Sequence, residues 1–127
     1  MDEKLNVCAR TFQQEHTEIE LLLDELLSAV RSGADSVELF QAAQRAVADH
    51  YAREDEFLNA LLPQFPHPAA KLLAQHAEAL EIAAQAEHSL ATGHRSDALS
   101  LIRRFHAIAQ HNIIEEERDL FPLLPPA

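Results

Sequence analysis

The 127-residue chain contains one cysteine, two glycines and no tryptophan. A lone cysteine, Cys8, excludes an internal disulfide and makes structural zinc unfavourable. We interpret Cys8 as a small buried residue near a helix start, with a reactive or metal-binding role as the alternative. The acidic N-terminus, MDEK, also lacks the apolar stretch of a signal peptide. These features together predict a cytoplasmic protein.

Basic residues are also scarce. The chain has 10 Lys and Arg against 21 Asp and Glu, which gives a formal net charge of −11. This balance argues against nucleic acid and anionic membrane surfaces as partners. The apolar run LLLDELL is interrupted by Asp24, so no membrane-spanning segment is expected. The composition is compatible with a small-molecule ligand, and it does not indicate which proteins the chain binds.

Few residues interrupt the helical patterns. Gly33 and Gly93 each follow a long helical pattern, as a helix stop does, and prolines cluster at residues 63–68. These breaks predict helices over about residues 7–31, 35–62, 68–90 and 96–121. Asp35 and Glu38 stand in capping-box register at the start of the second helix. The short connections make neighbouring helices antiparallel, so residues 1–127 are predicted to form one all-α domain, an up-down-up-down four-helix bundle.

One histidine falls on the apolar stripe of each predicted helix. The stripes follow three- and four-residue spacings. The four histidines are His16, His50, His76 and His111. Antiparallel packing brings all four to a similar height near one end of the bundle. A single histidine on such a stripe is usually a satisfied core residue, but four at one level predict a buried metal site.

Carboxylates close to these histidines indicate which metal the site would take. Glu54 follows His50 by four residues and shares its helix face. In the last helix, Glu115 lies four residues after His111 and Glu116 five, so either could be the second carboxylate. Imidazole nitrogen combined with carboxylate oxygen suits iron, and a glutamate can bridge two ions. Neither an HExxH zinc-protease helix nor the Glu-x-x-His pairs of ferritin-like proteins occur.

Four segments in order, EHTEIELLLDEL, HYAREDEFL, AQHAEALEIA and HNIIEEERDLFP, resemble the hemerythrin-like, or HHE cation-binding, family. The resemblance covers essentially the whole chain. It implies a four-helix bundle with an oxo- or hydroxo-bridged di-iron centre. By position it implies as ligands His16, His50, Glu54, His76 and His111. The second bridge falls on Glu116 by the His-x4-Asp/Glu pattern and on Glu115 by the His-x3-Glu variant.

The chain departs from oxygen-carrying hemerythrins in the third helix. Those proteins place two histidines four residues apart there, whereas His76 is flanked by Leu72 and Leu80. One iron should therefore lack a protein ligand; nearby Tyr51 is interpreted as packing. We predict a non-haem di-iron protein that binds or senses O2, NO or peroxide. The alternatives are a di-iron enzyme that reduces peroxide or repairs iron–sulfur clusters, and a metal-free helical interaction module.

Overall fold

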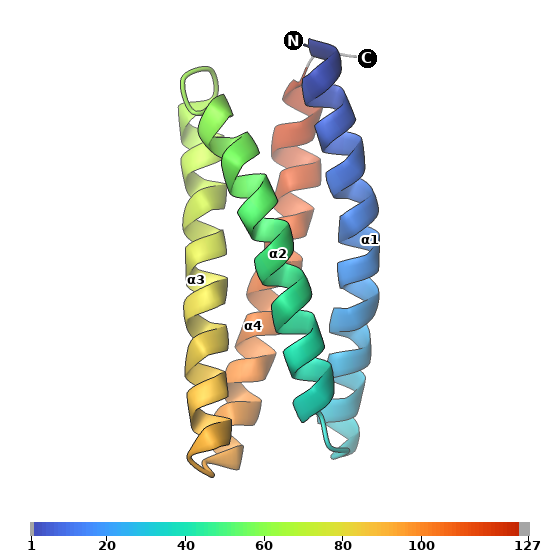
Figure 1. The fold of residues 1–127 in the computed structure, drawn as a ribbon, viewed down its shortest axis with the longest axis vertical. Coiled ribbons are helices and arrows are strands. Elements are labelled where there is room, and N and C mark those ends of the chain that lie inside the picture. The colour runs from blue at the N-terminus through green and yellow to red at the C-terminus, as the bar shows by residue number, and fades with distance from the viewer. Residues whose placement is uncertain (1, 125–127) are drawn as a thin grey trace.

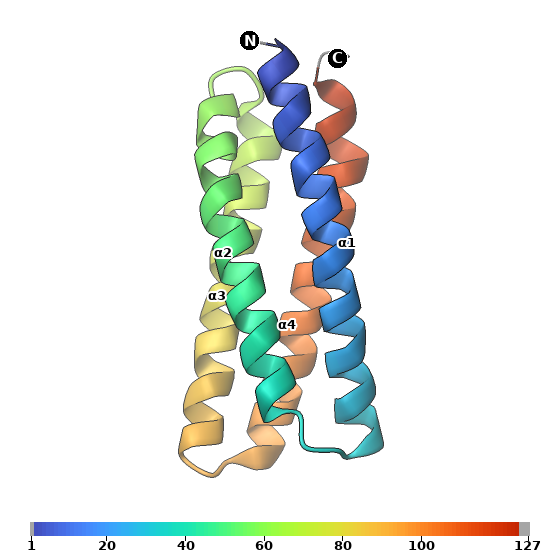
Figure 2. The same cartoon turned by 45° about the vertical axis from the view of Figure 1, so that its right-hand side comes forward.

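The computed structural model describes residues 2–124, with side chains from residue 8 onward. Four long helices lie side by side: α1 (Asp2–Ser32), α2 (Val37–Leu61), α3 (Pro66–Ala91) and α4 (Arg95–Glu115). A π-helical turn, η1 (Glu116–Leu120), and a 3-10 turn, η2 (Phe121–Leu123), follow α4. Figures 1 and 2 show consecutive helices running in opposite directions, with both chain ends at the same end of the bundle. The predicted four-helix bundle is confirmed.

Helices α1 and α3 end just before the glycines from which their ends were predicted. Gly33 and Gly93 have positive φ angles of 75° and 79°, a conformation that side chains with a Cβ disfavour. Beyond them, Ala34 N–H donates to Ala29 C=O at 3.0 Å, which closes the last turn of α1. At the start of α2, Asp35 accepts a hydrogen bond from Val37 N–H at 3.1 Å, so it supports the helix start without the predicted capping box.

The core is divided into two apolar clusters. The larger one, here the major cluster, includes Leu26, Phe40, Ala83 and Phe105. The other, here the terminal cluster, lies nearer the chain ends and contains Ala9, Phe12, Phe57, Leu58, Leu61, Ala69, Leu72, Leu120, Phe121 and Leu124. Within the described residues, no helix combines the length and apolar character needed to cross a membrane. Buried polar side chains, among them His16, His50 and His76, lie between the major and terminal clusters.

The buried stripes predicted for α1 and α3 hold, as does that of α2 from His50 onward. The first half of α2 instead buries Phe40 and Val47 where Leu39 and Ala46 were expected, and the α4 stripe was assigned one residue out of register. Its buried seam runs through Ile102, Phe105, Ala109, Asn112 and Glu116. The seam predicted from the sequence was Leu101, Phe105, Ile108, His111 and Glu115, which shares only Phe105 with the observed one. Both seams have the three- and four-residue spacing of a helix face, so periodicity alone does not separate them. In the observed register, Phe105 and Ala109 join the major cluster together with Ala79, Ala83 and Ala86 of α3.

Candidate metal centre

Five buried polar residues from three helices and η1 meet between the two apolar clusters. We call them the carboxylate–histidine cluster: His16 of α1, His50 and Glu54 of α2, His76 of α3 and Glu116 of η1. Each is no more than 1% exposed. The Nε2 atoms of the three histidines all point to the carboxylates of Glu54 and Glu116, which lie at the centre.

Each central carboxylate is shared between opposite histidines. His16 Nε2 lies 3.2 Å from Glu54 Oε2 and 3.1 Å from Glu116 Oε1. His76 Nε2 lies 3.3 Å from Glu54 Oε1 and 3.2 Å from Glu116 Oε2. His50 Nε2 is 2.9 Å from Glu54 Oε1. Thus both carboxylates present one oxygen toward His16 and the other toward His76.

The outward-facing nitrogen of every histidine is held by another carboxylate. The Nδ1–carboxylate pairs are His16–Glu117 at 2.6 Å, His50–Glu15 at 2.7 Å and His76–Asp55 at 2.7 Å. These three outer carboxylates are partly exposed, between 22% and 42%. Because a carboxylate accepts the Nδ1–H, the Nε2 lone pair is free to face inward. Metal-binding histidines are typically oriented in this way.

The outer carboxylates Glu15, Asp55 and Glu117 were not predicted. Each adjoins a cluster residue in the sequence, yet each binds the histidine of a different helix. Glu15 also accepts a hydrogen bond from Arg53 at 2.7 Å. Adjacency to an expected ligand was the available signal, but it is weak in a chain with 21 acidic residues. Only the packing of the helices reveals which acidic residue meets which imidazole.

Aromatic side chains fix the planes of the imidazoles. Tyr51 stacks on His76 with ring centroids 3.8 Å apart and an interplanar angle of 10°. The other two contacts are a stacked pair of Phe121 with His16 at 5.9 Å and an edge contact of Phe12 with His50 at 5.6 Å. Tyr51 is therefore packing, as predicted, but it packs directly on a cluster histidine. Its burial raises the pKa of the phenol well above the usual range.

His111 and Glu115 lie outside the cluster. The His111 side chain is 60% exposed, and its Nε2 lies 2.7 Å from Glu115 Oε1. Glu115 also meets Lys71 Nζ at 3.1 Å and accepts from Gln75 Nε2 at 2.7 Å. The expectation that His111 joins the other histidines is wrong because the α4 seam passes through position 112. Of the two possible carboxylates, the structure brings Glu116 into the cluster.

The cluster has the properties of a cation site. His50 Nε2, Glu54 Oε1 and Glu116 Oε1 are buried without a partner in hydrogen-bond geometry among the described residues. Leaving buried polar atoms unsatisfied is costly, and a cation among them would remove that cost. Donor atoms of His16, His50, Glu54 and Glu116 also lie within 4.8 Å of one another. The residues therefore fit a bound metal ion.

Without a metal, protons balance the buried carboxylates. Burial opposes a charged His16, but its close contacts with the carboxylates of Glu116 and Glu54 outweigh this effect and raise its pKa to about 10. The pKa of His76 is raised to about 10 for the same reasons. Burial raises the pKa of Glu54, but the three histidines around its carboxylate outweigh this effect and hold the pKa well below its usual range. Burial, with the charge of Glu54, raises the pKa of Glu116.

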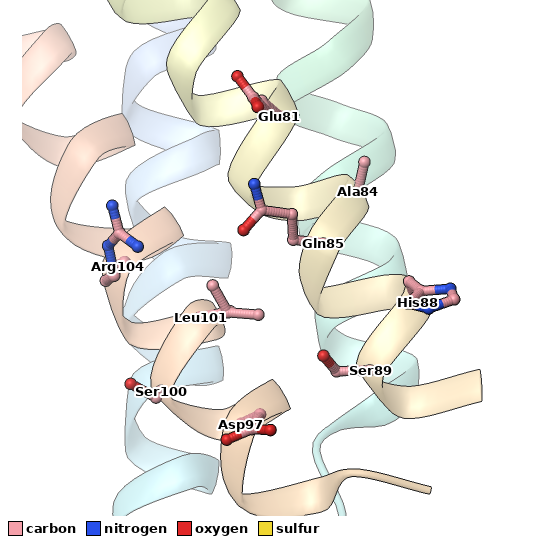
Figure 3. Close-up of a pocket in the computed structure, with 9 residues that line it drawn as sticks. All are labelled: Glu81, Ala84, Gln85, His88, Ser89, Asp97, Ser100, Leu101 and Arg104. Atoms are coloured by element: carbon pink, nitrogen blue, oxygen red, sulfur yellow. The ribbon is translucent and has the colours of Figure 1, made fainter. Parts of the chain in front are cut away.

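A surface groove of about 680 Å³ lies elsewhere, between α3 and α4. Figure 3 shows Glu81, Gln85 and His88 of α3 on one side of it and Leu101 and Arg104 of α4 on the other. None of the carboxylate–histidine cluster lines this groove. The groove is therefore separate from the candidate metal centre.

Comparison with known families identifies the class of the bundle. Residues 9–124 match the hemerythrin HHE cation binding domain. The chain therefore belongs to the hemerythrin HHE cation-binding family. The comparisons with curated proteins and with solved structures gave no match. The family and the buried His/Glu cluster together point to cation binding.

We expect the metal-free protein to lose stability as the pH rises from 6.5 to 10. The pKa values of His16 and His76 rise from 6.5 to about 10 on folding, so their stabilisation is complete below pH 6.5 and disappears as pH passes 10. The raised pKa of Glu116 acts in the same direction above pH 4.5. Thermal melts after chelation should show Tm falling by about 5 °C or more.

The variant His16→Gln should flatten this pH dependence, whereas His88→Gln, at an exposed position of α3, should keep it. A metal-free protein whose Tm is constant or rises over this range would contradict the charge balance described above.

Proposed function

We propose that the chain is a non-haem iron protein that holds two ions in the carboxylate–histidine cluster and binds a small diatomic molecule or peroxide there. The observation that carries the proposal is the sharing of Glu54 and Glu116, each of which offers one oxygen toward His16 and the other toward His76. Carboxylates that bridge two ions offer their oxygens in this way.

Iron is favoured by the kind of donor atoms. Three imidazole nitrogens and two carboxylates form a mixed set, without the thiolates that select structural zinc. Membership of a cation-binding family supports a metal in general. When bound, iron supplies a centre that coordinates a small molecule and exchanges electrons with it. The polypeptide supplies oriented donors, charge balance and exclusion of bulk water.

A single ion is the alternative occupancy. The four residues whose donor atoms lie within 4.8 Å of one another would suffice for one ion. That arrangement leaves the second oxygen of each carboxylate, and His76, without a metal. Two ions use all five residues, so we favour two.

The size of the ligand follows from the burial of the site. The cluster residues are at most 1% exposed and lie between the major and terminal apolar clusters. Two six-coordinate ions would have positions that three imidazoles and two carboxylates do not fill. Leu72, which is 2% exposed in the terminal cluster, and Leu80 flank His76 and supply no donor atom where oxygen carriers would have a second histidine. Because these unfilled coordination positions are enclosed by the protein, only a small ligand would fit there.

Neighbouring glutamates provide a matched test of the site. Glu116→Gln should reduce the iron content of protein purified with excess iron from about two per chain to one or fewer, because it removes a bridging carboxylate. Glu115→Gln should leave the iron content unchanged, since Glu115 lies outside the cluster and a glutamine there still offers an oxygen that accepts from Gln75 Nε2. Elemental analysis gives the result. Equal iron in both variants, or loss only in Glu115→Gln, would show that the assignment is wrong.

Asp55 provides a test of the outer carboxylates. Asp55→Asn should weaken iron binding about 10- to 100-fold, because it removes the charged acceptor that holds His76 Nδ1. Glu56→Gln, at the next and exposed position, is the control and should have no effect. Competition with a chelator measures the change. An Asp55→Asn variant with wild-type affinity would mean that this contact does not support the site.

Ligand addition separates a binder from an enzyme. The iron-loaded protein should change its ultraviolet–visible spectrum with nitric oxide, azide or peroxide, without sustained peroxide consumption. Continuous turnover of peroxide would instead favour the enzyme. A colourless, fully helical protein that takes up no iron would favour the metal-free interaction module and end the proposal.

A further inference from the structure

The polar residues around the cluster repeat one layout in the two halves of the bundle. In the first half they are Glu15 and His16 of α1 with His50, Glu54 and Asp55 of α2. In the second half they are Gln75 and His76 of α3 with Asn112, Glu116 and Glu117 of α4 and η1. Each half thus has two adjacent residues on one helix and an i, i+4, i+5 set on the next. His50 and Asn112 hold equivalent places in this order.

The contacts repeat as well as the spacing. The outer carboxylate of each half binds the histidine of the other half, since Asp55 binds His76 and Glu117 binds His16. Within the first half, Glu15 accepts from His50 Nδ1 at 2.7 Å. Within the second half, Gln75 Oε1 accepts from Asn112 Nδ2 at 2.9 Å.

In both halves, the residue that donates this hydrogen bond has a second polar atom without a partner. His50 Nε2 and Asn112 Oδ1 are both buried without a hydrogen-bond partner among the described residues. His50 Nε2 faces Glu54 four residues along α2. Asn112 stands in the same relation to Glu116, four residues along the chain, and is fully buried. The oxygen of Asn112 therefore corresponds to the inward nitrogen of His50.

Hydrogen bonds from the surface fix which end of the Asn112 amide is free. Glu115 lies against Lys71, and the hydrogen bond from Gln75 lowers its pKa, so its carboxylate accepts. Gln75 must then turn its amide nitrogen to Glu115 and its oxygen to Asn112. Asn112 in turn must donate to Gln75 through its nitrogen, because the reversed amide would place two oxygens together. The Asn112 atom without a hydrogen-bond partner is thus the amide oxygen Oδ1, whose lone pairs can coordinate a cation.

We propose that Asn112 Oδ1 is a metal ligand of the centre, a role that rests on the function proposed above. One ion would take His16 and His50, and the other would take His76 and Asn112, with Glu54 and Glu116 bridging both. The first position then has two nitrogen donors, whereas the second has one nitrogen and an amide oxygen. Iron binds less tightly where imidazole is replaced by a neutral oxygen donor. The second position is therefore the weaker one.

Two substitutions at position 112 test this assignment. Asn112→Leu keeps the approximate volume but removes the oxygen, so iron retained after dialysis against a chelator should fall from about two to one per chain. Asn112→His can donate to Gln75 from Nδ1 and present Nε2 to the metal, as His50 does. It should therefore retain the second iron at least 10-fold longer than the wild type. Elemental analysis during dialysis gives both results, and melts of the metal-free variants report folding.

His106→Leu is the matched control. His106 also lies on α4, is 7% exposed and has an unpartnered buried Nε2, but it faces Asp24 at 4.0 Å instead of the cluster. It should retain both irons as the wild type does. If the wild type binds two irons and Asn112→Leu retains both equally long, Asn112 is not a ligand and the proposed function stands. If Asn112→Leu does not fold, a second iron lost from Asn112→His as fast as from the wild type overturns the inference. A wild type that takes up no iron refutes the function itself.

Discussion

Two buried carboxylates at the centre of three imidazoles are the constraint on which the rest of the structure depends. Glu54 and Glu116 are each at most 1% exposed, and an uncompensated carboxylate at such a position costs several kcal/mol. Protonated His16 and His76 supply compensation in the metal-free protein, and a bound cation would supply it in the loaded one. Removing one partner of such a group costs about 3–5 kcal/mol, so the cluster ties α1, α2 and α3 to η1, the turn that continues α4.

The arrangement around the carboxylates is a set of connections between neighbouring helices. Glu15 joins α1 to α2, Asp55 joins α2 to α3, and Glu117 joins η1 to α1. The π-helical turn begins at Glu116, where a wider turn changes which residues face inward. Glu116 and Glu117 lie four and five residues after Asn112, as Glu54 and Asp55 lie after His50 in the regular helix α2. Within the turn Glu117 binds His16, and just beyond it Phe121 stacks on the same imidazole. π turns often occur at functional sites.

The sequence contained enough information for the fold and for most of the site, and its limits have physical causes. Gly33 and Gly93 mark helix ends because the backbone there needs a positive φ angle. His16, His50 and His76 were predicted because imidazole is rare on an apolar stripe. His111 was misplaced because two α4 registers have equal spacing, and the bulky Leu101 and Ile108 favoured the wrong one. Only the packing of α4 against the other helices decides between the two registers.

Asn112 illustrates a second limit of the sequence. An asparagine near the end of a helix has no distinctive pattern, and the same is true of an outer carboxylate among many acidic residues. The role inferred for Asn112 emerges only when its contact with Gln75 is set beside the contact of His50 with Glu15. Specific side-chain contacts, and not periodicity, define the second half of the site.

The most direct measurement is anomalous diffraction at the iron edge from crystals of the iron-loaded protein. The account predicts two peaks per chain, both between Glu54 and Glu116, with one nearer His16 and His50 and the other nearer His76 and Asn112. A single peak would contradict two-ion binding. A peak beside His111 and Glu115, with none at the cluster, would contradict the location of the metal centre.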